Sequence, residues 1–243
     1  MPAVIGHRGC GSLAPENTLA AIRKAIALGL EGVELDVQMG RDGCLVLLHD
    51  DDLTRTTTGT GLLKHHEWQT LASLDAGAWF SAEFVGERLP LLEEALDLIN
   101  GRLITFLEIK SPEIAGPFSR AILQANAVHW TRTLSFSDDA LLRVKAHCPE
   151  MVCGLAVRPP AAGPYDPDLL LSRLSKHAIP LVGLFVDHLT LDLCVLLHTA
   201  GIQVFTGPVD SLETARQIAA FEPDFILSNR PDVLAAALYR PKN

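Results

Sequence analysis

The sequence predicts an α/β protein folded as a TIM (β/α)8 barrel, with a small inserted subdomain after the strand of the second βα unit. Short apolar runs of strand length alternate with longer segments of helix length along the chain, which is typical of a parallel sheet with helical crossovers. The count is close to eight such units in 243 residues, a length that a single α/β barrel often fills. Only residues 51–89 break the rhythm, with polar, loop-like sequence and a few apolar residues of their own.

We therefore expect one domain over residues 1–243 that contains an insertion at residues 51–89. A doubly wound open sheet is the alternative fold. It is disfavoured because no G-x-G-x-x-G sequence follows the first apolar run, so a dinucleotide site is not indicated.

Apolar runs, helix caps and turn residues predict the individual elements. The first helix is capped by Asn17 or Thr18 and ends at Gly29, and a turn at residues 41–43 precedes a short third strand. The expected strands are residues 3–6, 32–37, 44–48, 103–109, 133–136, 151–157, 180–186, 202–206 and 224–228. The expected helices are residues 15–28, 91–99, 114–125, 138–147, 166–177, 190–200, 211–221 and 232–239.

Two acids on the second strand are the first sign of a functional site. Glu34 and Asp36 are two residues apart, so their side chains lie on the same face of the strand. A third acid, Glu108, ends the neighbouring strand of the predicted barrel. Three carboxylates form a hard oxygen site that suits Mg²⁺ or Ca²⁺. A solvated acidic face on an edge strand would explain Glu34 and Asp36 without any ligand.

Histidines and basic residues follow the same strands. His7 and Arg8 come after the first strand, His49 after the third, and Lys110 directly after Glu108. Taken singly, each residue has a structural explanation: a histidine that caps or packs, an arginine paired with a structural acid, a salt bridge between Glu108 and Lys110. Taken together at strand ends, where barrels carry their chemistry, they fit phosphodiester hydrolysis. Histidine is suited to acid–base catalysis near neutral pH, and cations neutralise a phosphate.

The composition limits the range of partners and compartments. A net charge of −9 argues against general nucleic-acid binding. Five scattered cysteines without a C-x-x-C pair predict reduced, buried thiols in a cytoplasmic protein, with Cys10 beside the candidate site as the one to watch. We expect no signal peptide and no stable membrane insertion, since no apolar run reaches spanning length. A homodimer is compatible with the sequence.

Five motifs in this order resemble the glycerophosphodiester phosphodiesterase family, in its bacterial, cytoplasmic type. They are His7-Arg8-Gly9, Pro15-Glu16-Asn17-Thr18, Glu34-Leu35-Asp36, His49-Asp50 and Glu108-Ile109-Lys110. The insertion resembles the family as well, in Arg55-Thr56-Thr57, Leu74-Asp75-Ala76-Gly77 and the run from Gly86 to Glu94. The match is highly specific from residue 4 to about residue 110, and it continues more weakly to Asp232.

This resemblance implies a TIM barrel with a small insertion and a divalent metal held by Glu34, Asp36 and Glu108. It also implies roles for the five other residues: His7 and His49 as general acid and base, Arg8 and Lys110 on the phosphate, and Glu16 as an orienting residue. The expected reaction is the metal-dependent hydrolysis of a glycerophosphodiester to glycerol 3-phosphate and an alcohol, by attack of water or of the substrate's own hydroxyl.

Two strand ends depart from the family pattern. Phe205-Thr206-Gly207-Pro208 stands where the family usually has a Trp-Thr-Val-Asn-like run, and Ser228-Asn229-Arg230-Pro231 stands where it often has Thr-Asp before a proline. We expect these changes to reshape one wall of the pocket and to affect the preference for the alcohol. Two alternatives therefore stay open: an enzyme like a lysophospholipase D, and a non-catalytic phospho-ligand binder on the same scaffold.

Overall fold

Eight parallel strands form a closed barrel in the computed structural model, which describes residues 1–161 and 163–238. Hydrogen-bonded neighbours follow the order β1-β9-β8-β7-β6-β5-β4-β2, and pairing of β1 with β2 closes the ring. The barrel strands are β1 (Ala3–Gly6), β2 (Gly32–Met39), β4 (Ile104–Ile109), β5 (Thr131–Ser135), β6 (Cys153–Ala156), β7 (Leu181–Leu184), β8 (Gln203–Thr206) and β9 (Phe225–Ser228). The predicted TIM barrel is therefore confirmed, and the open doubly wound sheet is excluded.

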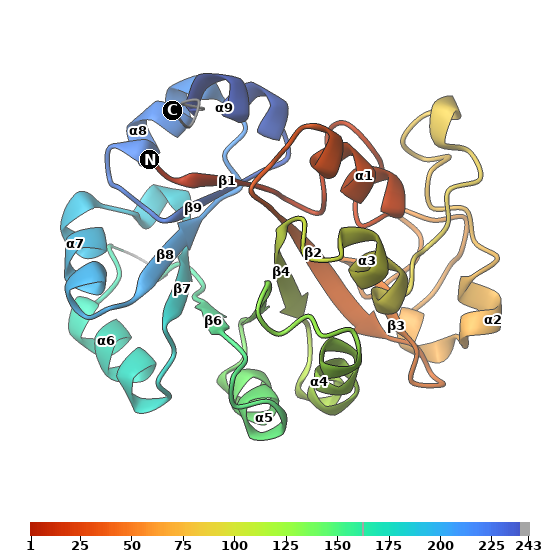
Figure 1. Cartoon of the computed structure of the whole chain (residues 1–243), viewed down its shortest axis with the longest axis horizontal. Helices are drawn as coiled ribbons and strands as arrows, with labels where there is room; N and C mark the ends of the chain where they lie inside the picture. The colour runs from red at the N-terminus through yellow and green to blue at the C-terminus, as the bar shows by residue number, and fades with distance from the viewer. Residues whose placement is uncertain (162, 239–243) are drawn as a thin grey trace.

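Helices connect the strands and lie around the outside of the barrel (Figure 1). They are α1 (Leu19–Ala27), α3 (Leu92–Ile99), α4 (Ala115–Gln124), α5 (Asp138–His147), α6 (Pro167–Lys176), α7 (Leu191–Thr199), α8 (Leu212–Ala219) and α9 (Pro231–Leu238). Each lies within a few residues of its predicted range. The first helix begins only at Leu19, because Asn17 has a left-handed backbone (φ 56°) and the Thr18 side chain accepts the capping hydrogen bond from the Ala21 amide. Tyr239, the last residue of the expected final helix, lies outside the described residues.

The expected third strand lies at the side of the barrel. β3 (Leu45–Leu47) pairs antiparallel with the end of β2, and residues 51–89 leave from it to the side of the barrel near α1 and α3 (Figure 1). These residues contain the short helix α2 (Trp68–Leu71) and two 3-10 turns, η1 (Leu63–His65) and η2 (Ala82–Phe84). Their apolar side chains pack with two from the β3 segment in a cluster of their own: Val46, Leu48, Leu53, Leu63, Leu71, Ala76 and Leu89.

Two further apolar clusters build the barrel itself. Inside the ring, Phe106, Phe205 and Phe225 pack with aliphatic side chains of other strands. Between the strands and the helices lies the larger core, to which Val33, Leu35 and Val37 of β2 belong. The alternation of β2 thus buries its apolar side chains under the helices and turns Glu34 and Asp36 toward the barrel interior. No helix within the described residues is long and apolar enough to cross a membrane.

Candidate active site

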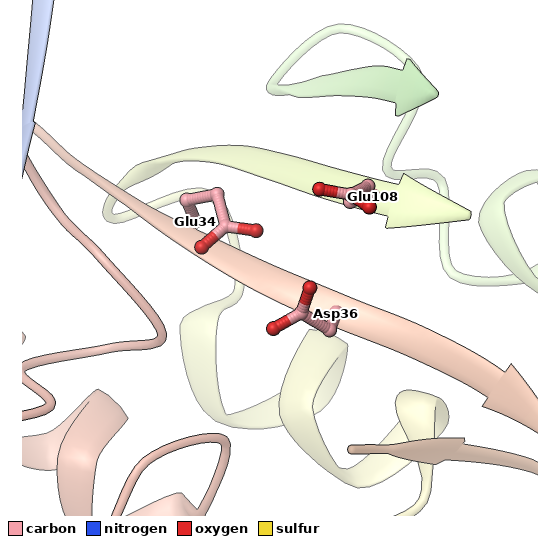
Figure 2. Close-up of side chains that lie close together, drawn as sticks. All are labelled: Glu34, Asp36 and Glu108. Carbon is pink, nitrogen blue, oxygen red and sulfur yellow. The ribbon is translucent and has the colours of Figure 1, made fainter. Parts of the chain in front are cut away.

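Three carboxylates converge at the carboxyl end of the barrel. In the register of the parallel β2–β4 pair, Asp36 lies beside Glu108, and Glu34 is two residues earlier on the same face. One oxygen from each of the three acids lies within 4.8 Å of the others, and Glu34 and Asp36 are almost fully buried. Figure 2 shows the three side chains of two neighbouring strands reaching into one space. The geometric expectation from the sequence is met.

Burial and mutual repulsion disfavour negative charge on this cluster of acids. Burial, followed by the charges of Asp36 and Glu108, raises the pKa of Glu34 well above its ordinary value. For Asp36 burial acts in the same direction, but Lys110, His49 and Arg8 outweigh it and hold the pKa of Asp36 below its ordinary value. A cation bound by all three acids would relieve this repulsion. Their oxygens are the hard ligands that Mg²⁺ and Ca²⁺ prefer, so the residues present fit a divalent metal.

The loop after β1 fixes the acids from one side. Asn17 is buried and makes two hydrogen bonds with Asp36: its Nδ2 donates to Oδ2 of Asp36 (2.8 Å), and its Oδ1 accepts from the Asp36 amide (3.0 Å). The backbone amide of Arg8 donates to Oε2 of Glu34 (3.1 Å). Arg8 and Asn17 both have left-handed backbones, with φ of 52° and 56°. This conformation folds the loop back over the end of β2.

Two basic side chains neutralise the acids and face the same cavity. The Lys110 ammonium lies 2.5 Å from Asp36 Oδ1 and 2.6 Å from Glu108 Oε1. Burial lowers the pKa of Lys110, but these two carboxylates outweigh it and hold the lysine charged. The Arg8 guanidinium donates from Nη1 to Glu16 Oε1 (2.8 Å). Its Nε is buried, makes no hydrogen bond among the described residues and lies 3.6 Å from Oδ2 of Asp36.

His7 is held by a chain of hydrogen bonds from the segments that follow the neighbouring strands β9 and β8. Its Nδ1 lies 2.8 Å from Oδ1 of Asn229, and Nδ2 of Asn229 donates to Asp210 (2.9 Å). Asp210 also accepts from the Ser228 hydroxyl and from the backbone amides of Asn229 and Arg230. A carboxylate accepts only, so the Asn229 amide must turn its NH₂ toward Asp210 and its oxygen toward His7. His7 Nδ1 therefore carries the proton, and Nε2 keeps its lone pair. Burial and the charge of Arg8 lower the pKa of His7.

His49 has an ionic partner instead. Its Nδ1 lies 2.6 Å from Oδ1 of Asp50, so the ring donates this proton to the carboxylate. Asp50 is in turn bound by Arg55 of the insertion, through Nε (2.5 Å) and Nη2 (3.0 Å). These hydrogen bonds hold the pKa of Asp50 well below its ordinary value. This hydrogen bond leaves Nε2 as the ring nitrogen of His49 that is available for proton transfer.

A cavity of about 300 Å³ opens above these groups. One half of its wall is polar and comes from the first four strands: His7, Arg8, Glu34, His49, Glu108 and Lys110. The other half, contributed by the strands β5 to β9 and the segments that follow them, is apolar: Leu134, Phe136, Ala156, Gly183, Leu184, Phe185, Phe205, Gly207, Pro208 and Leu227. The site therefore combines a highly charged side for a metal and a phosphate with an apolar side for another part of a ligand.

Comparison with known proteins identifies the family. Residues 7–233 match the model of the glycerophosphoryl diester phosphodiesterase family. The chain belongs to this family. A glycerophosphodiester phosphodiesterase of Caldanaerobacter subterraneus subsp. tengcongensis is 33% identical over 237 residues, which cover 95% of each chain. The expectation of a phosphodiesterase is thus confirmed.

Solved structures of glycerophosphodiester phosphodiesterases extend the comparison to the fold. A phosphodiesterase of Oleispira antarctica, in complex with the product sn-glycerol-3-phosphate, is 30% identical, with a TM-score of 0.87 over 98% of this chain and 97% of that one. A glycerophosphodiester phosphodiesterase of Agrobacterium tumefaciens is 28% identical, with a TM-score of 0.84 over 97% of this chain and all of the other. Both alignments span the barrel from end to end.

All eight residues predicted for the site come together in the structure. Six line the cavity, Asp36 lies beneath them, and Glu16 holds Arg8 from behind. The sequence interpretation assigned no role to the residues that orient them: Asn17, Asp50, Arg55, Asp210 and Asn229. Four of these lie inside or beside the sequence segments compared with the glycerophosphodiester phosphodiesterase family, and this position was the signal that could have identified them. Asp210 lies outside all of them.

Cys10, although next in sequence to the site loop, is fully buried, and burial raises the pKa of its thiol to about 12. It is a packing residue and not a nucleophile.

Proposed function

We propose that this enzyme hydrolyses glycerophosphodiesters to glycerol 3-phosphate and an alcohol, with the help of a divalent cation. The observation that carries the proposal is the shared cavity: three converging carboxylates, two histidines and two basic side chains line or underlie one space. The product named for the Oleispira antarctica phosphodiesterase supports the same chemistry.

Glu34, Asp36 and Glu108 would hold the cation, which is Mg²⁺ or Ca²⁺. When bound, the cation supplies positive charge that neutralises the phosphate and its transition state. The side chain of Asn17 keeps Asp36 in place for this task, because it hydrogen bonds both the backbone amide and the carboxylate of Asp36. Glu34, whose charge is the least compensated of the three, has the most to gain from the cation.

Arg8 and Lys110 would bind the phosphate. The Arg8 side chain lines the cavity, while its guanidinium pairs with Glu16 and lies 3.6 Å from Asp36 through Nε. Lys110 reaches the same wall while it pairs with Asp36 and Glu108. Both side chains thus place positive charge where a phosphodiester would gain charge in its transition state.

The hydrogen-bond partners of the two histidines favour different roles. Asn229 accepts the Nδ1 proton of His7, and the lowered pKa of His7 favours the neutral ring, in which Nε2 presents a lone pair. We assign His7 as the general base that takes the proton from the attacking oxygen, of water or of the substrate's own hydroxyl. His49 donates its Nδ1 proton to the carboxylate of Asp50, so Nε2 is its ring nitrogen for proton transfer. It is the general acid that gives its Nε2 proton to the leaving oxygen of the alcohol.

The test is an assay of the purified protein with glycerophosphocholine, glycerophosphoethanolamine and glycerophosphoglycerol, each with Mg²⁺ or Ca²⁺. Release of glycerol 3-phosphate is followed by coupling to its dehydrogenase. We expect product with at least one cation and none in excess chelator. Absence of product with every head group and cation would refute the proposal, and binding of substrate without turnover would favour the phospho-ligand binder.

The route of attack has its own signature. If the adjacent glycerol hydroxyl attacks, a cyclic glycerol phosphate accumulates before glycerol 3-phosphate and is visible in ³¹P NMR spectra. If water attacks, glycerol 3-phosphate appears without this precursor. Water supplies one phosphate oxygen by either route, because it also opens the cyclic phosphate, so the cyclic species and not an isotope label distinguishes the routes.

A second candidate activity is cleavage of lysophospholipids in the manner of a lysophospholipase D. The apolar half of the cavity favours it, because Phe136, Phe185 and Phe205 offer a surface suited to an acyl chain. Matched rates with glycerophosphocholine and lysophosphatidylcholine decide between the two substrates. The cytoplasmic location and the homodimer expected from the sequence stay predictions.

A further inference from the structure

Arg55 connects two parts of the site without lining its cavity. It lies in the insertion, and its guanidinium spans two carboxylates from different segments of the chain. Its Nη1 and Nη2 bind the two oxygens of Glu16 at 3.0 and 2.8 Å, while its Nε and Nη2 bind the two oxygens of Asp50 at 2.5 and 3.0 Å. Both contacts are bidentate, a geometry that only the planar guanidinium provides.

Each of these carboxylates holds one of the polar groups that face the cavity. Glu16 accepts from Nη1 of Arg8 at 2.8 Å, and Asp50 accepts from Nδ1 of His49 at 2.6 Å. Hydrogen bonds thus link five side chains in a row: Arg8, Glu16, Arg55, Asp50 and His49. The guanidinium of Arg55 is the middle member and joins the phosphate side of the site to the proton-transfer side.

Removal of this guanidinium would leave both carboxylates without their main partner. A single nitrogen, Nη2 of Arg55, contacts an oxygen of Glu16 and an oxygen of Asp50, so the two carboxylates would face each other as neighbouring like charges. Repulsion would move them apart, and Arg8 and His49 would move with them. Neither histidine nor Arg8 would lose a direct contact, so the effect on the site is purely one of position.

We propose that Arg55 is a positioning residue of the enzyme, through which the insertion sets Arg8 and His49 at the same time. The insertion is then a part of the active site and not only an appendage of the barrel. This inference rests on the proposed function for its kinetic consequences, but the hydrogen bonds to be tested exist independently of it.

Variants of the two carboxylates separate the effect on Arg8 from the effect on His49. Glu16→Gln weakens the contact through which Arg55 holds Arg8, so we expect KM to rise about tenfold with little change in kcat. Asp50→Asn weakens the contact through which Arg55 holds His49, so we expect kcat to fall about ten- to hundredfold with little change in KM. Arg55→Gln should do both, and Arg55→Lys should restore only part of either because an ammonium cannot bridge two carboxylates bidentately.

A matched control comes from another ion pair of the insertion. Arg41, in the turn after β2, pairs with Glu67 of the insertion at 2.7 Å on the exposed surface, away from the cavity. Arg41→Gln removes a tether of the same chemical type and should leave kcat and KM unchanged. In the double variant Arg55→Gln/Asp50→Asn, the loss in kcat should be no larger than in the more damaged single variant.

The experiment measures kcat and KM for these variants at saturating cation, with thermal melts to confirm folding. In parallel, long-range ¹H–¹⁵N NMR spectra follow the ring nitrogens of His49. We expect the Nδ1 signal of His49 to shift in Arg55→Gln and Arg55→Lys but not in Arg41→Gln. Unchanged kinetics in folded Arg55→Gln, equal losses in Arg41→Gln, or additive losses in the double variant would overturn the proposal. If the wild-type protein shows no activity, the proposed function fails, and the NMR result alone decides the role of Arg55.

Discussion

Replacing Glu34 by glutamine should make the metal-free protein more stable and the metal-bound protein less stable than wild type. The acid is buried with Asp36 and Glu108, and one oxygen of each lies within 4.8 Å of the others. Two unit charges at that separation repel by about 3.5 kcal/mol at an effective dielectric constant of about 20. Protonation of Glu34, whose pKa is raised, and the attraction of Lys110 relieve part of this repulsion. We therefore expect Glu34→Gln to stabilise the metal-free protein by about 1–3 kcal/mol.

When the cation is bound, the wild type should be more stable than Glu34→Gln. A ligand at about 100 times its Kd stabilises the folded state by about 2.7 kcal/mol, which for a chain of this size corresponds to a rise in Tm of about 5–10 °C. Glu34→Gln lacks one charged ligand and should lose most of this gain. A glutamine oxygen can still accept the hydrogen bond from the Arg8 amide, so the substitution removes charge with little change in shape.

Thermal melts in excess chelator and in saturating Mg²⁺ or Ca²⁺, at pH 7.5, measure both effects. Glu31→Gln is the control, because Glu31 directly precedes β2, does not belong to the three-carboxylate cluster and accepts from the Val4 amide. Its response to the cation should match that of wild type. A metal-free Glu34→Gln that melts below wild type, or an equal rise in Tm on adding cation, would refute the reasoning.

Two further predictions concern pH. The raised pKa of Glu34 means that a proton competes with the cation, so the rise in Tm caused by Mg²⁺ or Ca²⁺ should shrink as pH falls from 8 to 5; a rise independent of pH would contradict the raised pKa. A general base works only when it is neutral, so kcat/KM should fall with decreasing pH as His7 becomes protonated. Because the pKa of His7 is lowered, this acidic limb of the pH profile should lie below about pH 6.5. Asn229→Asp replaces a neutral acceptor by a carboxylate, which stabilises the imidazolium, and should move the limb to higher pH; an unmoved limb would argue against His7 as the base.

The sequence predicted the fold and the centre of the site because both follow from local periodicity. Alternation along β2 places Glu34 and Asp36 on one face, and the order of barrel strands places Glu108 next to them. The histidines and basic residues followed from the rule that barrel chemistry lies at strand ends. The motif resemblance added specificity to a pattern that physical reasoning had already located.

The partners that orient these groups could not be predicted in the same way. Asn229 reaches His7 across 222 positions of sequence, and Arg55 reaches Glu16 across 39. Such contacts depend on the conformations of loops at the mouth of the barrel, which no periodic pattern encodes. The departure at Asn229 was visible in the sequence, but its consequence, an amide that fixes the tautomer of His7, required the position of Asp210.

The most direct test of the proposed mechanism is a crystal structure of the protein with Mn²⁺ and glycerol 3-phosphate, with anomalous data collected for manganese. We predict a single strong anomalous peak between the carboxylates of Glu34, Asp36 and Glu108, a phosphate in contact with Arg8, and Nε2 of both His7 and His49 facing that phosphate. A cation bound elsewhere, or a phosphate outside the reach of the two histidines, would contradict the mechanism proposed for this enzyme.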